Sequence, residues 1–435
     1  MKKLTRRSFL EKTTVAGLAT LASHAHSKSH AAEKTHPLDG IERENIRITD
    51  ITVTPLSYVD PTGNLWRHGS RMIWKSDAAP CRIYTNQGII GIGEGTPYAS
   101  PDEIKAYTET VLKPMLIGKN PWDAVRMRQV DASHFVHTAS WAGVDVALWD
   151  IIGRVKNKPV YELLSVDGNP QPRLHMYASG GVEHECYNKG ADFLVTEAVR
   201  YQALGFDAFK LRRGTDWKFS NMTFNKYEPI LRRLREAVGP DFKLMHEIIG
   251  GTGMPTEQVV NEFCPLLDEL NFHWFEMPVP GMDNYIRIAK KLKKVKVSGG
   301  ETHRTLAQTK PWIESGAIEI VQTDCNVTGL TENWLISRLA DGHGIQHCPH
   351  NWHGGLTTIG NAHLVAAIPN RHMLETNMTF NPLKEAIFKD PLVVKNGWMD
   401  LPDKPGYGVE LIENVEKKFP YTPGDFRKQN PNIAG

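Results

Sequence analysis

The sequence lacks both a long hydrophobic segment and an excess of charge of either sign. No apolar run reaches the length of about 20 residues that crosses a bilayer as a helix, and 51 Lys and Arg residues balance 49 Asp and Glu residues. A balanced chain has no broad electrostatic field that would hold nucleic acid or an anionic membrane. We therefore expect a soluble mature protein with a small polar ligand and with neither a nucleic-acid nor a membrane partner. We also expect it to form a homo-oligomer.

Cysteine is scarce, and no two cysteines form a C-x-x-C pair. An odd number of cysteines cannot close entirely into intramolecular disulfides. We interpret them mostly as buried free thiols. The five are Cys81, Cys186, Cys264, Cys325 and Cys348.

The N-terminal residues resemble a twin-arginine export signal. Arg6 and Arg7 precede a short, mostly apolar stretch over residues 13–22, which is too short to span a bilayer. Small residues follow and offer cleavage points, so we expect residues 1–32 to be removed after about Ala25 or Ala32. The mature protein is then periplasmic or otherwise extracytoplasmic. A basic tail without a signal function is the alternative.

The first part of the remaining chain reads as an α+β domain over residues 43–170. Residues 45–94 have a strand-like pattern with a hairpin turn at Asn86-Gln87-Gly88. A helix is expected to start at Pro101, with Ser100 as its N-cap. A longer helix carries apolar residues at helical spacing up to Val155 and ends near residues 157–159. Strands followed by helices are typical of an α+β arrangement.

After residue 170 the hydrophobicity pattern changes to short apolar runs that alternate with stretches of helix length. Eight such runs predict a (β/α)₈ barrel of the TIM type over residues 171–397, and residues 398–435 are expected to return to the first domain. The length of 435 residues suits one large domain and one smaller one. The runs span residues 174–178, 208–212, 242–247, 272–276, 295–301, 318–324, 344–350 and 372–375.

Ionisable residues recur at the ends of these runs at intervals of 29, 25, 23, 26 and 25 residues. Each interval is the length of one strand and one helix, and unrelated surface charges have no reason to keep that spacing. The C-terminal ends of barrel strands form one rim, where catalytic groups lie. The residues are Glu247, Glu276, Glu301, Asp324, His350 and Glu375.

Three of these acids, Glu247, Glu276 and Glu301, follow one another on successive strands. Carboxylates crowded into one funnel repel each other, and burial raises their pKa unless a cation balances them. Oxygen ligands without a nearby Cys and His set favour Mg²⁺, or alternatively Mn²⁺, over Zn²⁺. We predict that these three residues bind the metal.

The chain resembles the mandelate racemase and muconate lactonizing enzyme group of the enolase superfamily over residues 43–423. The motifs are Phe275-Glu276-Met277-Pro278, Gly299-Gly300-Glu301, Lys210-Leu211-Arg212, Asp324, His350 and the helical residues 141–164. The resemblance implies an α+β capping domain on a modified barrel, and Mg²⁺ held by three strand-end carboxylates. It also implies removal of a proton α to a carboxylate, with the enediolate stabilised on the metal.

Two positions depart from the family pattern. The third strand reads His246-Glu247-Ile248 where the family usually has Asp-x-Asn, so the first ligand is one methylene longer. His246 should face away from the site, since alternate residues of a strand point to opposite sides. On the second strand Arg212 replaces a lysine that often acts as a base, and arginine stays protonated. Arg212 suits the binding of a carboxylate or hydroxyl, beside Lys210.

The resemblance gives the base role to His350, paired with Asp324. A carboxylate on one ring nitrogen fixes the tautomer and raises the basicity of the other. Glu375 matches the strand-eight acid that supports the enediolate opposite the metal. Further pocket residues are expected just past the strand ends and in the loop of residues 60–72, although a plain surface loop explains the latter nearly as well. They are His303, Asn326, Asn351, Trp352 and His353, with Trp66 and Arg67 from the loop.

One usable histidine favours one-sided chemistry, namely α-proton removal followed by loss of the β-hydroxyl. This predicts an acid-sugar dehydratase that forms a 2-keto-3-deoxy acid, in line with superfamily sites that use a Lys or His base with Mg²⁺. A racemase, an epimerase or a lactone cycloisomerase stays open, because Lys210 could act as a second base. An exported sugar-acid-binding protein on an inactive scaffold is the alternative from another class. Pure binding would not need the pair of Asp324 and His350.

Overall fold

The structure is a computed structural model that describes residues 34–429 apart from 64, 69–70, 129, 183–190, 213–221 and 249–253. The expected export signal and Cys186 lie outside the described residues. The four other cysteines are buried and free, as the sequence predicts. Among the described residues, no helix combines the length and apolar character needed to cross a membrane.

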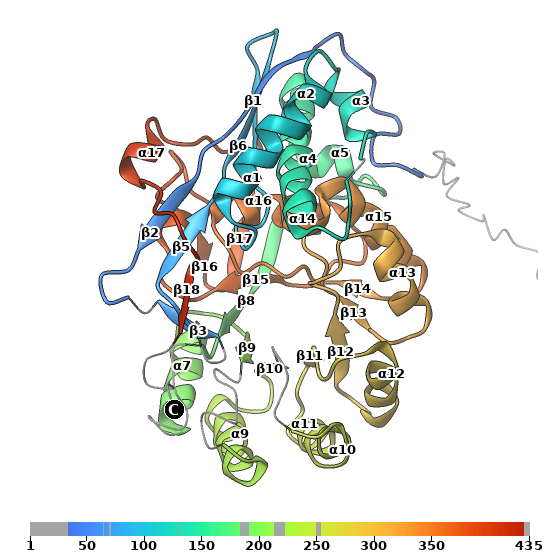
Figure 1. The fold of residues 1–435 in the computed structure, drawn as a ribbon. Helices are drawn as coiled ribbons and strands as arrows, with labels where there is room; N and C mark the ends of the chain where they lie inside the picture. Colours follow the sequence, from blue (N-terminus) through green and yellow to red (C-terminus); the bar gives the residue numbers. More distant parts are fainter. Residues whose placement is uncertain are drawn as a thin grey trace, which may run out of the picture. The chain divides into compact units, whose positions relative to one another are not determined.

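The N-terminal domain starts with an antiparallel sheet of β1 (Ile48–Val53), β6 (Cys81–Thr85) and β7 (Ile90–Gly93), in the order β1-β6-β7. The hairpin predicted at residues 86–88 joins β6 to β7, where Gly88 takes a φ of 75°. The helices that follow are α1 (Pro101–Tyr107), the π-helical turn η1 (Thr108–Leu112), α2 (Lys113–Leu116), α3 (Pro121–Val125), α4 (Phe135–Val155) and α5 (Val160–Leu164). Figure 1 shows them in the upper part of the molecule.

The long helix α4 packs closely on β7, and glycines make this approach feasible. A Cβ at Gly91 would lie 2.2 Å from the carbonyl oxygen of Ala147, and one at Gly93 would lie 2.4 Å from that of Gly143. Such distances are far below van der Waals contact, so residues 91–95 need small side chains at alternate positions. The repeated glycine in the sequence is therefore explained by helix packing.

The predicted start of the helix at Pro101 and the predicted end of the longer helix near residues 157–159 are confirmed, with two local differences. Ser100 precedes α1 as expected, but its side chain makes no capping hydrogen bond. The residues 141–164 that carried part of the resemblance form two helices, because α4 ends at Val155 and α5 begins at Val160. Asn157 has a φ of 51° between them, and Pro159 cannot continue a helix from the preceding turn.

Two smaller sheets carry the segment that approaches the site. In one, β2 (Leu56–Val59) pairs with β5 (Lys75–Ala78). In the other, β4 (Arg71–Ile73) lies between β3 (Trp66–His68) and the C-terminal strand β18 (Arg427–Gln429), and both pairings are antiparallel. The last described strand of the chain thus pairs with a strand near residue 70.

The second domain confirms the predicted barrel. Its parallel strands are β8 (Arg173–Gly180), β9 (Ala208–Arg212), β10 (Lys243–Glu247), β11 (Trp274–Glu276), β12 (Lys296–Gly299), β13 (Ile320–Val321), β14 (Gln346–His347) and β15 (Leu374–Asn377). They pair in sequence order from β8 to β14, and β15 pairs with β8. A parallel bridge between His347 and Arg371 completes the ring.

Helices follow the strands around the outside of the barrel, as Figure 1 shows for the lower half. They are α7 (Ala191–Ala203), α9 (Phe224–Val238), α10 (Thr256–Gln258) with the π-helical turn η2 (Val259–Phe263) and α11 (Cys264–Glu269), α12 (Met282–Lys291), α13 (Leu306–Glu314), α14 (Cys325–Thr328) with α15 (Leu330–Gly342), and α16 (Gly355–Ala367).

The barrel is modified after its eighth strand. The chain continues through the 3₁₀ turn η3 (Pro382–Lys384) and the hairpin of β16 (Val394–Lys395) and β17 (Trp398–Asp400), followed by the short helix α17 (Val415–Lys418). Strand β17 pairs antiparallel with β8 on the other side from β9. An antiparallel strand therefore stands next to the first barrel strand.

The barrel interior contains a separate buried cluster of Tyr177, Ala208, Met245, Trp274, Ile320, Cys348 and Met373. Several of these residues lie on strands, two positions before an ionisable residue. Because side chains alternate along a strand, Lys210, Glu247 and Glu276 continue the inward-facing rows of Ala208, Met245 and Trp274 toward the rim.

Candidate active site

On strand β10, His246 points away from the barrel interior, on the opposite side from Glu247. Its Nε2 lies 2.8 Å from the hydroxyl of Tyr227 on α9, and its ring packs edge-on against Phe263 at 4.9 Å. The histidine is fully buried between barrel and helices. The sequence prediction that His246 serves packing is confirmed, and the alternation leaves its neighbour Glu247 pointing inward.

Lys210 is the centre of a buried ion-pair network. Its Nζ lies 3.1 Å from Glu247 Oε2, 2.7 Å from Glu276 Oε1 and 3.0 Å from Glu375 Oε1. Burial lowers the pKa of Lys210, but the three carboxylates outweigh it and raise that pKa well above its usual value. Lys210 is therefore a fixed positive charge in this arrangement.

Arg212 lies beside this network. Its Nε donates to Glu247 Oε2 at 2.9 Å, and its guanidinium lies over the ring of Trp352 at 4.6 Å. Its Nη2 is buried and has no acceptor among the described residues. One face of the guanidinium is thus held by the protein, and a nitrogen is left for an anionic or hydroxyl group.

The three glutamates predicted as metal ligands come together. One carboxylate oxygen from each of Glu247, Glu276 and Glu301 lies within 4.8 Å of the others. Glu247 Oε1 and Glu301 Oε2 are buried and receive no hydrogen bond from the described residues. Buried carboxylate oxygens without donors, in a set made only of oxygen, fit a hard divalent cation.

Burial and the neighbouring charges also shift the pKa values of these carboxyl groups. Burial, opposed by Lys210, raises the pKa of Glu276 to about 7, and burial also raises that of Glu301. Burial raises the pKa of Glu247 as well, but Arg212 and Lys210 outweigh it and the net shift is downward. A divalent cation would favour the charged forms of all three.

His350 and Asp324 form the predicted pair. His350 Nδ1 lies 2.9 Å from Asp324 Oδ2, and His350 Nε2 lies 3.7 Å from Glu301 Oε2. Burial lowers the pKa of His350, but Glu301 and the hydrogen bond to Asp324 outweigh it and raise the pKa to about 9. The second ring nitrogen faces the glutamate cluster, and without a cation there the ring is mostly protonated at neutral pH. A divalent cation at the glutamates would offset the charge of Glu301 and favour the neutral ring, which can accept a proton.

Asn326 and Asn351 each contact one acid of the site, Asp324 and Glu375 respectively. The backbone N and the Nδ2 of Asn326 donate to Asp324 Oδ1 at 2.8 and 2.6 Å. The backbone N of Asn351 donates to Glu375 Oε2 at 2.7 Å, and its Nδ2 donates to the carbonyl oxygen of Glu375 at 2.9 Å. Both asparagines are buried and hold an acid in place; contact with substrate stays a prediction for them.

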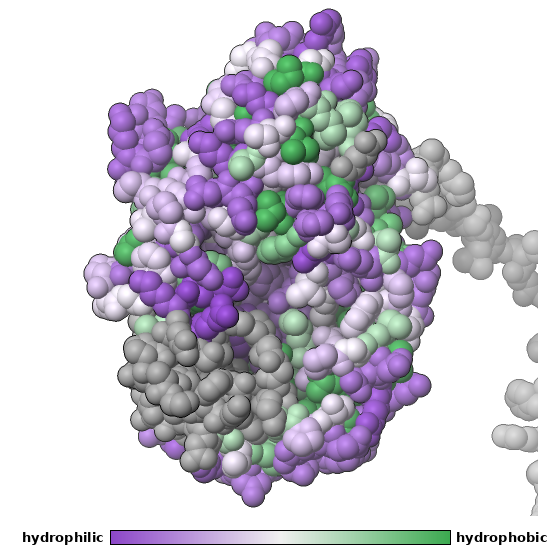
Figure 2. All heavy atoms as spheres, viewed as in Figure 1, coloured by the Kyte–Doolittle hydropathy of each residue, from purple (hydrophilic) through white to green (hydrophobic). Residues whose placement is uncertain are grey.

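Aromatic side chains of the first domain contact residues at the barrel rim. The rings of Trp66 and Trp352 meet edge-on with centroids 5.4 Å apart. His353 Nε2 lies 3.0 Å from the hydroxyl of Thr96, and the Nδ1 of His303 is buried without a partner among the described residues. The side chain of Arg67 lies outside the described residues. Figure 2 shows the surface hollowed in the middle of this view, with mostly hydrophilic walls.

Several residues of the site were missed from the sequence. Gln322 Nε2 donates to Glu276 Oε2 at 2.6 Å, and Asn361 Nδ2 donates to Asp324 Oδ1 at 3.0 Å. Tyr98 packs on His353 at 4.3 Å and stacks on Phe426 at 5.3 Å. Gln322 could have been found, because it lies two residues before Asp324 on the same predicted strand. Tyr98 and Phe426 carry no such signal.

Comparisons with known proteins agree with this geometry. Residues 194–415 match the family described as enolase C-terminal domain-like, and residues 74–165 match the mandelate racemase / muconate lactonizing enzyme N-terminal domain. The chain therefore belongs to the mandelate racemase and muconate lactonizing enzyme group, and it is an enzyme of the enolase superfamily.

Named relatives and solved structures cover most of the chain. An arabinonate dehydratase of Saccharolobus solfataricus is 30% identical over 347 residues, covering 78% of this chain and 89% of that protein. A D-galactarolactone cycloisomerase of Agrobacterium fabrum is 28% identical over 362 residues, again 78% and 89%. The structure of an enolase superfamily member from Polaromonas sp. JS666 matches with a TM-score of 0.75 at 28% identity, covering 87% of this chain and 98% of that one.

Proposed function

We propose that this protein is a Mg²⁺-dependent acid-sugar dehydratase that acts outside the cytoplasm. Several relatives carry dehydratase names, including the arabinonate enzyme above and a D-xylonate dehydratase of Haloferax volcanii, 27% identical over 362 residues. The proposal assigns roles to the three metal-binding glutamates, to Lys210 and Arg212, and to the pair of His350 and Asp324. It names a substrate class, a polyhydroxy carboxylate, without choosing one sugar acid.

The observation that carries the proposal is that His350 has a ring nitrogen available for proton transfer, whereas the proton of Lys210 is held by three carboxylates. His350 has one nitrogen bound to Asp324 and the other directed at the glutamate cluster. The Nζ of Lys210 lies within 3.1 Å of three carboxylates, all of which hold its proton in place. Proton transfer therefore falls to one group on one side, which suits elimination better than inversion at the α-carbon.

Glu247, Glu276 and Glu301 are the residues that would hold Mg²⁺, with Mn²⁺ as the alternative. A divalent ion bound there supplies positive charge that stabilises the negative charge developing on the substrate carboxylate. Lys210 and Arg212 add two fixed positive charges next to the same glutamates. The Nη2 of Arg212, which has no acceptor among the described residues, would orient a carboxylate or hydroxyl of the substrate.

The reaction uses His350 twice. Nε2 takes the α-proton, and the electron pair of the C–H bond moves into the substrate carboxylate to form an enediolate. The imidazolium then donates the same proton to the β-hydroxyl, the C–O bond breaks, and water leaves. The resulting enol tautomerises to the 2-keto-3-deoxy acid. Asp324 keeps Nδ1 protonated throughout, so that Nε2 is the nitrogen that exchanges protons.

A lactone cycloisomerase is the second candidate, because the Agrobacterium fabrum relative carries that name. Such a reaction also needs a proton moved at the carbon next to a carboxylate, which the same histidine can do. It differs in the leaving group, which is the ring oxygen of a lactone. A racemase or epimerase would need Lys210 to release its proton against three carboxylates.

The test is a screen of the purified protein with Mg²⁺ against aldonic acids, aldaric acids and their lactones. Formation of a 2-keto acid from an open-chain acid with loss of water identifies the dehydratase. Formation of an acid of the same mass as the lactone, from the lactone alone, identifies the cycloisomerase. Inversion of configuration without elimination would replace the proposal by a racemase or epimerase. Saturable binding without turnover or α-deuterium exchange in D₂O would leave a binding protein.

A further inference from the structure

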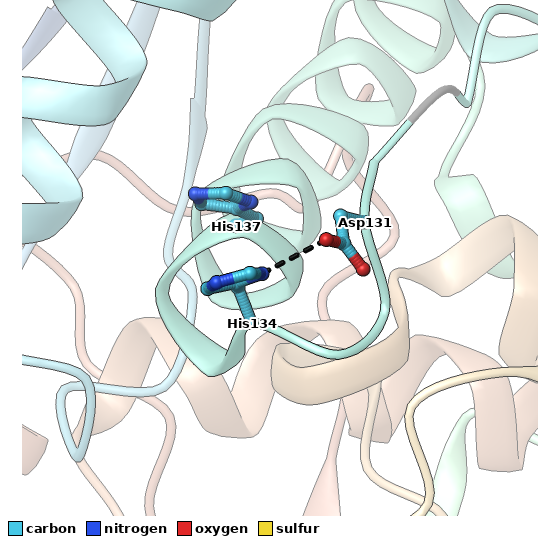
Figure 3. A group of neighbouring side chains, drawn as sticks. All are labelled: Asp131, His134 and His137. Carbon is cyan, nitrogen blue, oxygen red and sulfur yellow. Dashed lines mark hydrogen bonds and ion pairs between the residues drawn. The ribbon is translucent and has the colours of Figure 1, made fainter.

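A second group of metal-ligating side chains lies at the start of α4, outside the barrel rim. Asp131, His134 and His137 each offer a ligand atom, and these atoms all lie within 4.8 Å of one another. Figure 3 shows the two imidazole rings lying over each other, with the carboxylate of Asp131 directed at His134. Asp131 Oδ2 lies 2.9 Å from His134 Nδ1.

His137 is held in position by ring stacking, and one of its ring nitrogens has no hydrogen-bond partner among the described residues. Its ring stacks on Tyr107 at 4.1 Å with an interplanar angle of 14°, and on His134 at 4.7 Å with an angle of 23°. Its Nδ1 is buried and has no hydrogen-bond partner among the described residues. A buried imidazole nitrogen left without a partner costs free energy, and a metal ion would remove that cost.

Asp131 and His134 are accessible from solvent. Their side chains are 55% and 63% exposed, so an ion can enter without opening the fold. Hydrogen bonds from Ser133 and His134 lower the pKa of Asp131 to about 2, and the carboxylate is ionised at neutral pH. The cluster therefore combines one fixed imidazole with two accessible ligands, one of them charged.

We propose that Asp131, His134 and His137 form a second cation site, selective for a transition metal such as Zn²⁺ or Ni²⁺. Imidazole ligands favour these ions, whereas carboxylate and water ligands favour Mg²⁺. The proposed site thus differs in chemistry from the three glutamates, because it consists of two histidines and one aspartate. A third group of possible ligands, Asp324, His350 and His353, belongs to the active site. Water completes the coordination of the exposed site.

The ion is bound after a small rearrangement. At a Zn–N distance of about 2.0–2.1 Å, two ligands of a tetrahedral ion lie about 3.3 Å apart, which is less than the present spread of up to 4.8 Å. Stacked rings also cannot both point at one ion. His134, the exposed ring, turns about its side-chain bonds and exchanges its hydrogen bond with Asp131 for the metal, while Tyr107 holds His137.

The site lies where the first domain meets the barrel. Arg304 follows β12 by a few residues, and its Nη1 donates to the carbonyl oxygens of Ala132 and Ser133 at 3.1 and 2.8 Å. These carbonyls belong to the turn between Asp131 and His134. The positive charge of this guanidinium would repel a metal ion bound nearby. The guanidinium is hydrogen-bonded to the carbonyls of this turn, however, and lies over the ring of Phe135 at 5.0 Å. A bound metal ion would restrict the motion of this turn, which Arg304 already links to the barrel.

The test is a calorimetric titration of the full chain with Zn²⁺ in an excess of Mg²⁺. We expect one Zn²⁺ per chain at this site, and a rise of the melting temperature with Zn²⁺, since a ligand that binds only the folded state stabilises it. His24, His26 and His30 could also take Zn²⁺, so the titration uses a chain in which all three are changed to Asn.

The double variant His134→Asn/His137→Asn should lose the Zn²⁺ site. Loss of an outer-sphere partner already weakens metal sites by about 10–100-fold, and removal of two direct ligands should cost at least as much. Asp131→Asn should weaken binding to a lesser degree. His343→Asn, which changes an exposed histidine at the end of α15, is the matched control and should bind as the parent does.

Three results would overturn the proposal. The parent chain could fail to bind Zn²⁺ in excess Mg²⁺, or the double variant could bind it unchanged. Binding could also be lost in Glu276→Gln and kept in the double variant, which would place the ion at the catalytic glutamates. If the double variant is less stable without metal, electron paramagnetic resonance of bound Cu²⁺ decides, with the parent chain compared with His134→Asn, which changes an exposed side chain. Coupling to imidazole nitrogen that is the same in both proteins would then also overturn the proposal.

Discussion

Asp324 Oδ2 lies 2.9 Å from Nδ1 of His350, and both residues are buried. The other carboxylate oxygen of Asp324 accepts hydrogen bonds from the side chains of Asn326 and Asn361. The aspartate cannot turn away from the histidine without breaking these bonds. Its position therefore fixes which nitrogen of His350 carries the proton and which one faces the site.

The first prediction concerns proton transfer by His350. His350→Asn should remove both product formation and α-proton exchange in D₂O, since loss of a general base costs about 10²–10⁴-fold. Asp324→Asn should show part of this loss, because it disturbs the tautomer and lowers the pKa of the histidine. The measurements are turnover and deuterium incorporation followed by NMR.

Lys210→Ala is the contrasting variant for this prediction. It removes a positive charge next to Glu247, Glu276 and Glu375, so substrate binding and turnover should weaken while some exchange survives. Exchange that persists in His350→Asn and vanishes in Lys210→Ala would move the base to strand β9. A racemase or epimerase would then be the better assignment.

The second prediction concerns the metal. Chelation should abolish turnover, and Mg²⁺ or Mn²⁺ should restore it, because the buried carboxylates of Glu247 and Glu276 and the partly buried one of Glu301 need a balancing cation. Glu276→Gln should bind Mg²⁺ more weakly and lose activity. Glu314→Gln, at an exposed glutamate on α13, is the control. Full activity of a metal-free Glu276→Gln protein would contradict the prediction.

The third prediction concerns the N-terminal twin arginine. Changing Arg6 and Arg7 to Lys should leave a folded, uncleaved protein inside the cell, because the signal would no longer be read. The measurement is the mass and location of the protein in cell fractions. Unchanged export and processing of the variant would show that these residues are not a twin-arginine signal.

The fourth prediction concerns stability in acid. His363 is fully buried on α16, and its Nδ1 accepts the backbone N–H of Tyr161 at 3.2 Å. Burial lowers the pKa of His363 to about 3, against about 6.5 in an unfolded chain. Between these values the unfolded state binds the proton that the folded state does not. The stability contribution is complete above about pH 6.5 and decreases as the pH falls toward 3.

The expected contribution of this one histidine is about 1.4 kcal/mol per pH unit at full slope. The free energy of unfolding, measured with urea between pH 7 and pH 4, should therefore fall less steeply in His363→Gln than in the parent. His343→Gln, at an exposed position, should keep the parent's slope. Equal slopes in all three proteins would show that His363 does not resist protonation.

Much of the barrel and its rim could be predicted from the sequence. A strand and a helix of similar length repeat around a barrel, so acids spaced by 23 to 29 residues reach the same edge. Alternation along a strand likewise separates Glu247, which points inward, from His246, which packs on Tyr227. These are periodic properties of neighbouring residues, and a sequence displays them directly.

The capping hydrogen bond of Ser100 and the separate short helix α5 were less predictable. Ser100 has the right type and position for an N-cap, yet its side chain makes no capping bond. The break between α4 and α5 depends on Asn157, which takes a left-handed backbone conformation with a φ of 51°. Tertiary packing chooses between such alternatives, because their intrinsic free energies differ by only about 1 kcal/mol.

By itself, the sequence determined the order of the elements, the strand on which or just after which each acid lies, and the exclusion of Arg212 as a base, since these follow from periodicity and from side-chain chemistry. Only the tertiary structure decided that one ammonium, on Lys210, is shared by three carboxylates. It also brought Tyr98 and Phe426 together beside His353. These contacts join segments far apart in the chain, and their distances are set by how the elements pack.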